Sequence, residues 1–258
     1  MTINADRIEE ARSFVHQVEL PRAPRVSRDF DSGATRTALD QMKNQATVVG
    51  SSVVSFVTGV TPENRRDIVN CSLLAQLAAN KAVPSRDDIR TWYEAYFNAL
   101  SHLGWVIQER GFVQYRESGD DFEANKAVLS VAAVLFGAAP ASLSVIQSTL
   151  DAMKSMAGGP WITIFRRESQ SAKAARFQIT LVEPTRDNGF TVALMAFELE
   201  ATAALAQALF FKFRSSEVTL RHASGRVTID ADVLMAVRSA IAEKISAYTR
   251  NYIADLPL

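Results

Sequence analysis

The residue best suited to chemistry is Cys71, the single cysteine of the chain. Its neighbours in the sequence are mainly apolar, a setting in which a cysteine is usually a small core residue. A reactive or acylated thiol is the alternative. Neither a histidine nor an aspartate stands directly beside it, although catalytic partners can come from distant parts of a chain. Arg65 and Arg66 lie one to two helical turns earlier and would lower the pKa of the thiol only if they shared its face.

The other residue types that carry chemistry do not form a recognised motif. His16, His102 and His222 stand singly, without the spacing of metal ligands. The acidic run from Asp120 to Glu123 opens a predicted helix, where negative charge offsets the helix dipole. Glycine-rich phosphate loops and a nucleophile elbow are absent from the sequence. We therefore predict neither catalytic residues nor a metal site.

Aromatic and basic residues alternate near one end of the sequence. Phe210, Phe211 and Phe213 are interleaved with Lys212 and Arg214, a pattern that can stack nucleic-acid bases. A nucleic-acid binder usually carries a basic excess, whereas this chain has 28 Lys+Arg against 28 Asp+Glu. The balance of charge argues against a nucleic-acid partner. We therefore interpret these aromatic residues as part of a sheet whose apolar face is covered by helices.

The overall composition is that of a globular protein. Of the 258 residues, 48% are hydrophobic and 22% are charged, which is unlike a disordered chain. A single cysteine also excludes a scaffold held by internal disulfides. We predict one α+β domain over residues 1–258, helical over 1–104, mixed over 105–160 and mainly β over 161–230, with a C-terminal helix over 231–255.

The N-terminal half reads mainly as helices. Apolar residues spaced three and four apart predict a helix over 39–60, and Gly59 is suited to end it. The uncharged run 48–57 is rich in small and β-branched residues, so a buried strand is the alternative there. Thr61 and Pro62 are typical of a cap and first residue of a second helix, over 61–80. A third helix is predicted up to Gly104, with Ser85 as its cap.

The rest of the chain alternates between strands and helices. Segments 122–136 and 141–156 read as a second helical hairpin, broken at 137–140. Strands are predicted over 105–116, 161–167, 176–183, 190–199, 209–213, 218–221 and 227–229, and Asn188-Gly189 signals a β-turn. The predicted fold is an antiparallel or mixed sheet from the C-terminal half, covered by N-terminal helical hairpins and a C-terminal helix.

The longest uncharged stretch, residues 127–150, is the feature most suggestive of lipid. Its 24 residues match the thickness of a bilayer core. Serine, threonine and glutamine dilute its hydrophobicity, and the break at 137–140 divides it. A buried hairpin and a hairpin that inserts into lipid therefore both stay open, and the run 48–57 is a second, weaker candidate. The predicted membrane-contact residues are Val49, Val53, Phe56, Val131, Val134, Leu135 and Phe136.

Three stretches of the sequence resemble the Evf virulence-factor family of insect-associated enterobacteria. They are Val49-Gly50-Ser51-Ser52-Val53-Val54-Ser55-Phe56, the segment from Asn70 to Asn80, and Leu209-Phe210-Phe211-Lys212-Phe213. In that family a cysteine carries palmitate through a thioester, and the protein associates with membranes and promotes persistence in the insect gut. The resemblance implies that Cys71, the single thiol, is the candidate for lipidation.

The expected function is a non-enzymatic bacterial virulence or toxin-like factor that acts at a host membrane, with covalent palmitate at Cys71. One alternative is a cytoplasmic module that binds a hydrophobic small molecule or fatty acid, and another is an enzyme with Cys71 as nucleophile. Membrane lipid or a fatty acyl chain is the expected partner, whereas the sequence leaves the oligomeric state open. We expect a cytoplasmic location in the producing cell, export without a signal peptide and conditional membrane association.

Overall fold

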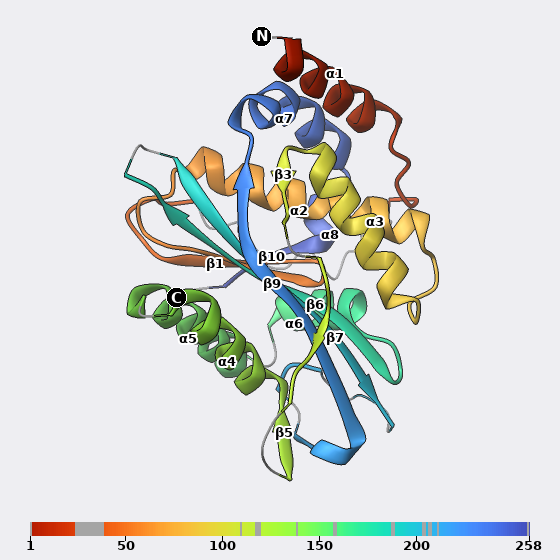
Figure 1. Ribbon diagram of the computed structural model, residues 1–258, viewed down its shortest axis with the longest axis vertical. Coiled ribbons are helices and arrows are strands. Elements are labelled where there is room, and N and C mark those ends of the chain that lie inside the picture. The colour runs from red at the N-terminus through yellow and green to blue at the C-terminus, as the bar shows by residue number, and fades with distance from the viewer. Residues whose placement is uncertain are drawn as a thin grey trace.

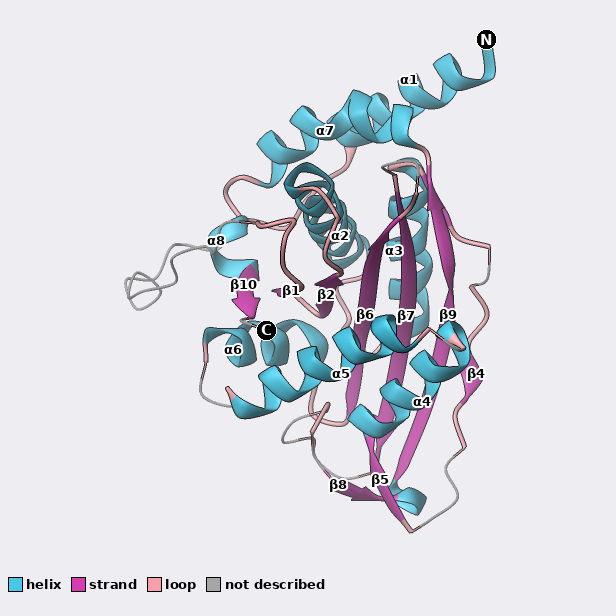
Figure 2. Ribbon diagram, turned by 90° about the vertical axis from the view of Figure 1, so that its left-hand side faces the viewer, coloured by secondary structure: helices cyan, strands magenta, loops and turns pink. Residues whose placement is uncertain are grey.

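The computed structural model describes residues 2–23, 39–108, 110–116, 120–137, 139–156, 159–186, 189–202, 205, 208–210, 212–256 and 258. A mixed sheet runs through its centre in the order β10-β1-β2-β6-β7-β9-β3, and β4 also pairs with β9. Helices cover both faces of this sheet (Figures 1 and 2). The α+β class predicted from the sequence is confirmed.

The middle of the sheet is a meander of three long antiparallel strands. These are β6 (Ala174–Pro184), β7 (Phe190–Ala201) and β9 (Val218–Ile229). β2 (Ser52–Phe56) runs parallel to β6, and β1 (Gln45–Val49) and β10 (Ile253–Leu256) extend the sheet from there. The shorter strands are β3 (Trp105–Val106), β4 (Val113–Gln114), and the separate pair β5 (Asp121–Glu123) and β8 (Lys212–Arg214).

Two groups of helices form the outer layers. The first group shares a hydrophobic core with one face of the sheet. It consists of α1 (Thr2–Gln17), α2 (Pro62–Ala82), α3 (Ile89–His102) and α7 (Ala231–Ile245). The second group packs with another core and contains α4 (Ala124–Phe136), α5 (Pro140–Ser155) and α6 (Pro160–Ser169). A short helix, α8 (Thr249–Tyr252), leads into β10.

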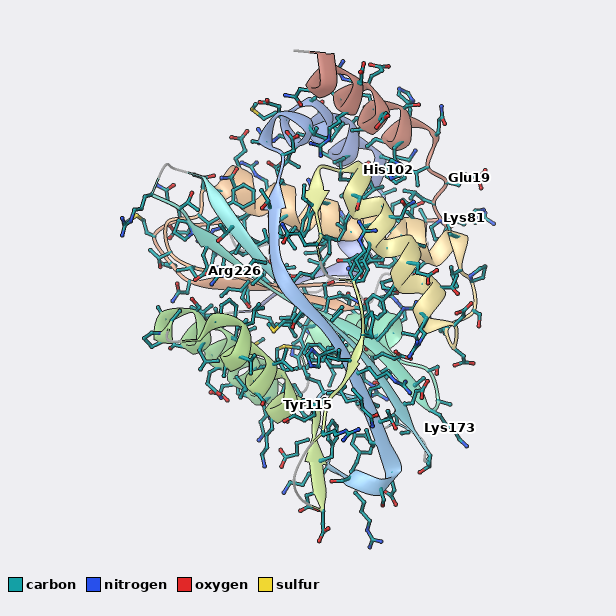
Figure 3. All side chains as sticks on the ribbon, in the orientation of Figure 1. Glu19, Lys81, His102, Tyr115, Lys173 and Arg226 are labelled. Atoms are coloured by element: carbon teal, nitrogen blue, oxygen red, sulfur yellow. The ribbon has the colours of Figure 1, made fainter. Side chains whose placement is uncertain are left out.

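Strands β6 and β7 are buried on both faces along most of their length, and the side chains of β7 alternate between the two cores. Leu194 belongs to the core under α2 and α3, whereas its neighbour Met195 belongs to the core under α4 and α5. Side chains fill the space between sheet and helices on both sides (Figure 3). A strand that is apolar on both faces needs two covering layers, and the helices supply them.

The helix predicted over 39–60 is wrong, because this stretch forms the hairpin β1–β2. Gly50 lies in its turn with φ +57°, and a Cβ there would lie 2.4 Å from Gln76 Oε1. The sheet therefore takes strands from the N-terminal half as well as from the C-terminal half. Val48 and Val53 pair across the hairpin, so the strand alternative for 48–57 is the correct one.

Other local predictions have mixed outcomes. Thr61 caps α2 and accepts a hydrogen bond from Asn64 N, as predicted. The α4–α5 hairpin is confirmed, but α4 begins only at Ala124, because the acidic residues Asp121–Glu123 form strand β5 instead of opening the helix. Asp88 rather than Ser85 caps α3.

Several strand and helix ranges need correction. The strand predicted over 105–116 is replaced by two short strands, β3 and β4. The segment 161–167 is helical rather than a strand, because Pro160 starts α6. The predicted strands 218–221 and 227–229 are one strand, β9. β8 begins only at Lys212, and the helix predicted over 231–255 ends at Ile245, before α8 and β10. Asn188 and Phe211 lie outside the described residues.

A buried polar network fastens α2 and α3 to the sheet. Gln178 on β6 accepts hydrogen bonds from Ser51 Oγ at 3.1 Å and from Ser52 Oγ at 2.6 Å. Gln76 on α2 accepts from Ser51 N at 2.8 Å and donates to the Val49 carbonyl at 2.8 Å. The structure of the β1–β2 turn thus depends on side chains from both the sheet and the helix.

Tyr93 on α3 completes the network at the centre of the sheet. Its hydroxyl lies 2.7 Å from the Phe197 carbonyl and 3.0 Å from the Phe177 carbonyl, and it accepts from Gln178 Nε2 at 3.0 Å. The side chain is fully buried. Because buried polar groups are costly to leave unpaired, this hydroxyl ties the α3 layer firmly to β6 and β7.

We expect Tyr93→Phe to lower the free energy of unfolding by about 1–3 kcal/mol, since it leaves the Gln178 amide and a strand carbonyl without their partner. Urea denaturation would measure the change. The matched control is Tyr115→Phe, at a half-buried position, which should change stability by less than about 0.5 kcal/mol. Equal losses for the two variants would contradict the role given to the Tyr93 hydroxyl.

Candidate functional site

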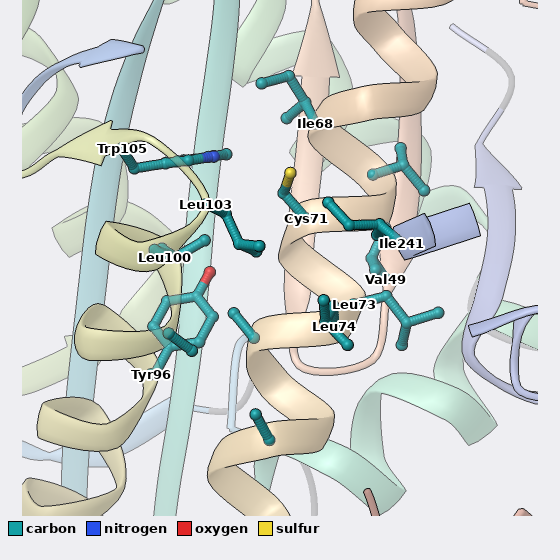
Figure 4. Packing of buried hydrophobic residues seen from close by; sticks show 14 of the residues in the cluster. Val49, Ile68, Cys71, Leu73, Leu74, Tyr96, Leu100, Leu103, Trp105 and Ile241 are labelled. Carbon is teal, nitrogen blue, oxygen red and sulfur yellow. The ribbon is translucent and has the colours of Figure 1, made fainter. Parts of the chain in front are cut away.

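Cys71 lies inside the core between α2 and α3. Its side chain is fully buried, and Figure 4 shows it close to Ile68, Leu103 and Trp105. Burial, with a smaller contribution from the negative charge of Asp67, raises the pKa of the thiol to about 12. At neutral pH this thiol is protonated and surrounded by apolar side chains, which is the setting of a structural cysteine.

The two arginines near Cys71 in the sequence serve other purposes. Arg65 is buried and donates to the Val60 carbonyl at 2.9 Å and to Gln45 Oε1 at 2.7 Å. It thereby holds the start of α2 against β1. Arg66 is exposed and bonds to the carbonyl of Pro62 on its own helix. Neither arginine activates the thiol.

An ion-pair cluster fastens α2 to α7. Arg238 donates to Asp67 from Nε at 2.9 Å and from Nη2 at 2.7 Å, and it also pairs with Glu63. Burial raises the pKa of Asp67, and the hydrogen bonds from Arg238 oppose that shift. A carboxylate with both oxygens held by one guanidinium is a structural group. Sequence reasoning missed this cluster because its members are 171 residues apart.

Within the described ranges, no group of three or more histidine, cysteine, aspartate or glutamate side chains is arranged to hold a metal ion. His222 lies on β9, and burial lowers its pKa. His102 ends α3 and stacks on Phe14 with ring centroids 4.6 Å apart. The histidines are therefore distributed over separate places.

The structure distributes the seven predicted membrane-contact residues over different environments. Val49, Val53 and Phe56 belong to strands β1 and β2 and are fully buried. Val131 and Phe136 face the core from α4, and Leu135 is half-buried. Val134 is exposed over 84% of its surface. The hairpin therefore presents Val134 to solvent, and the other residues reach lipid only if a layer opens.

The hairpin α4–α5 covers one face of the sheet with an apolar inner surface. Its buried residues on α4 and α5 include Val128, Val131, Ile146, Leu150 and Met153. Apart from Val134, the exposed positions described between residues 127 and 150 are small or polar, and none of them carries a charge. No helix within the described ranges is both long enough and apolar enough to cross a membrane.

The hairpin is tied to the sheet by few polar contacts. Ser55 on β2 and Thr149 on α5 share a hydrogen bond of 2.9 Å. Ser142, at the start of α5, donates to Glu183 on β6. The opposite layer has Gln76, Tyr93 and the network around them. The two helical layers therefore differ in how firmly polar side chains attach them.

A groove of about 430 Å³ lies between α2, α7 and the edge strands β1 and β10. Its lining includes Thr47, Arg66, Val69, Ile253 and Asp255. The groove mixes apolar and charged side chains. It is the place where the predicted alternative of a small-molecule site can be tested.

No family model matches the chain, and the search of curated proteins finds no match. Among solved structures, a delta-endotoxin is similar at 15% identity over 82% of this chain and 90% of that chain, with a TM-score of 0.41. The Evf virulence factor is similar at 9% identity over 88% and 91%, with a TM-score of 0.33. Activated Cyt2Ba from Bacillus thuringiensis subsp. israelensis is similar at 14% identity over 54% and 80%, with a TM-score of 0.30. The second of these belongs to the family that the sequence resembles.

The environment of Cys71 predicts an unreactive thiol. With a pKa of about 12, about one thiol in ten thousand is ionised at pH 8. We expect a thiol reagent at pH 8 to label the folded protein at least ~1,000-fold more slowly than the urea-unfolded protein.

The control places a thiol at an exposed position. Ser148→Cys combined with Cys71→Ala puts a single cysteine on the outer face of α5, and it should react at the rate of a free thiol. Rapid labelling of Cys71 in the folded protein would contradict the burial described above.

Proposed function

We propose that this protein is a non-enzymatic, toxin-like factor that acts on membranes by releasing the α4–α5 hairpin from the sheet. The observation that supports the proposal best is the contrast between the two helical layers. One is fixed by a buried polar network, whereas the other lies on the sheet through a mainly apolar surface. Apolar contacts with the sheet can be replaced by contacts with lipid at little cost in free energy.

The face that the hairpin covers is suited to lipid. It carries Phe177, Ile179, Leu181, Met195 and Phe197, all of them fully or almost fully buried. Burial of each such side chain is worth about 1.5–3 kcal/mol relative to exposure to water. The covered state is therefore stable in solution, and uncovering is favourable only where another apolar phase is present.

The length and charge of β7 agree with this proposal. β7 has eight uncharged residues in sequence, Phe190–Phe197, which span about 27 Å in an extended strand. This is close to the bilayer core thickness of about 30 Å. Within this proposal, β7 is therefore a candidate for entering the lipid.

The zero net charge determines what kind of membrane contact is expected. With 28 basic and 28 acidic residues, the chain as a whole is not drawn to an anionic surface. Binding has to come from apolar surface, so it should depend weakly on salt. The resemblance of the sequence to the Evf family supports a role in virulence.

Acylation of Cys71 stays a prediction from the sequence resemblance. Because the thiol is fully buried, an acyl donor could reach it only before folding or after α2 and α3 separate. Intact mass would show a gain of about one palmitoyl unit that neutral hydroxylamine removes and Cys71→Ala lacks. An unmodified protein from the native source would contradict lipidation and leave hairpin release unaffected.

A disulfide between hairpin and sheet tests the proposal directly. The hydroxyls of Ser55 and Thr149 are 2.9 Å apart, so cysteines at these positions can place their sulfurs within bonding distance. We expect the oxidised Ser55→Cys/Thr149→Cys protein to lose the ability to release dye from phosphatidylcholine vesicles. Reduction should restore release to the level of the unmodified chain, because the hairpin is free again.

The matched control is Thr47→Cys/Asp255→Cys, which joins paired positions of β1 and β10 and leaves the hairpin free. Its oxidation should not change dye release. If the oxidised Ser55→Cys/Thr149→Cys protein released dye as fast as its reduced form, membrane action would not require release of the hairpin, and the proposal would be wrong. A chain that releases no dye from any vesicle would refute the membrane role.

A further inference from the structure

Glu183 makes two different contacts near the end of β6. It lies on the sheet face that the α4–α5 hairpin covers, because it alternates with Leu181 and Ile179 along the strand. Its Oε1 accepts a hydrogen bond from Ser142 Oγ in the first turn of α5. Its Oε2 lies 3.5 Å from Arg226 Nη1 on β9. One carboxylate therefore joins α5 to a second strand of the sheet.

Arg226 extends this contact to the other helix of the hairpin. Its guanidinium carbon is 5.8 Å from the ring centroid of Phe136, the last residue of α4. β6 and β9 lie on either side of β7, so the Glu183–Arg226 pair crosses over β7. Figure 3 places Arg226 beside the end of the hairpin. The end of α4 and the start of α5 are thus both held at one point.

The position of this contact matters for how the hairpin could leave the sheet. Residues 137–140 connect the two helices, and Gly137 there has φ +56°. The Glu183 contact lies at this connection, whereas Ser55 and Thr149 meet further along α5 as a neutral pair. A hydrogen bond to a carboxylate is stronger than one between neutral groups. The connection is therefore the place where charge resists separation.

We infer that Glu183, with Ser142 and Arg226, is a latch that holds the connecting end of the hairpin against the sheet and sets how often the hairpin opens. Lipid can replace the apolar contacts of the hairpin, but its hydrocarbon offers nothing to a carboxylate or a serine hydroxyl. The latch therefore has to open before the rest of the hairpin separates. The consequence at a membrane rests on the proposed function, whereas the consequence in solution does not.

Hydrogen exchange of the intact chain in solution tests the latch without lipid. We expect Glu183→Gln and Arg226→Gln each to speed amide exchange in α4 and α5 about tenfold, equivalent to about 1.4 kcal/mol. Peptides from α2 and α3 should keep the exchange rates of the unmodified chain. Ser142→Ala removes only the hydroxyl and should give a smaller increase in exchange in the same peptides. This variant keeps the test valid even if the charge variants fold poorly.

The control is Arg7→Gln, which removes an ion pair of 2.9 Å between α1 and Asp230, away from the hairpin. It should leave exchange in α4 and α5 unchanged. If Glu183→Gln and Ser142→Ala both leave hairpin exchange unchanged, the latch is overturned.

Dye release from phosphatidylcholine vesicles then separates the two proposals. If the hairpin must open to act on lipid, Glu183→Gln should speed release by about the same factor as exchange. Faster exchange in a chain that releases no dye would uphold the latch and refute the membrane role. Faster exchange with unchanged release would show that the latch does not regulate that role.

Discussion

The structure depends on one constraint: strands β6 and β7 are buried on both faces along most of their length and must be covered on both. β7 carries apolar side chains alternately into two separate cores, whereas β6 carries most of its apolar side chains into one core and the buried Arg176, Gln178 and Thr180 on its other face. Such strands are stable in water only between two layers. The two covers come from different parts of the chain: α1, α2, α3 and α7 pack with one core, whereas α4, α5 and α6 pack with the other.

The two covers satisfy the constraint in different ways. On one face, Tyr93 and Gln76 enter the interface with hydrogen-bonding groups that require partners at fixed places, so the contact is specific as well as apolar. On the other face the inner surface is mainly aliphatic, and Thr149 meets Ser55 as a neutral pair. Specific polar contacts cannot be replaced by lipid, whereas aliphatic contacts can. The asymmetry therefore predicts which cover is able to move.

Local signals were sufficient for part of this fold. Thr61 with Pro62 marks the start of α2, and the break at 137–140 marks the α4–α5 hairpin, because capping and helix-breaking chemistry is local. The β1–β2 hairpin was missed because a strand that is buried on both faces has apolar residues at most positions. Such a run also contains apolar residues three and four positions apart, which is the pattern of a helix. Gln76 meets Ser51, and Glu183 meets Ser142, only through the tertiary fold. The spacing of residues along the sequence cannot predict such pairs. A glutamine within the apolar run of α2 was the available signal for a buried network.

The sequence pointed to Cys71 and to the uncharged stretch 127–150 as candidate sites, and the structure gives the two features different surroundings. Cys71 looked like the centre of the chemistry because it is unique, yet its burial and raised pKa make it part of the core. The uncharged stretch 127–150 has the more informative property. Its inner residues must match the sheet, and its outer residues face water without using charge, mainly through serine, glutamine and small residues, with Val134 as the apolar exception. Leaving the sheet would therefore not require residues 127–150 to bring a charge out of the core, since the contacts of this stretch with the sheet are apolar or made by neutral polar groups.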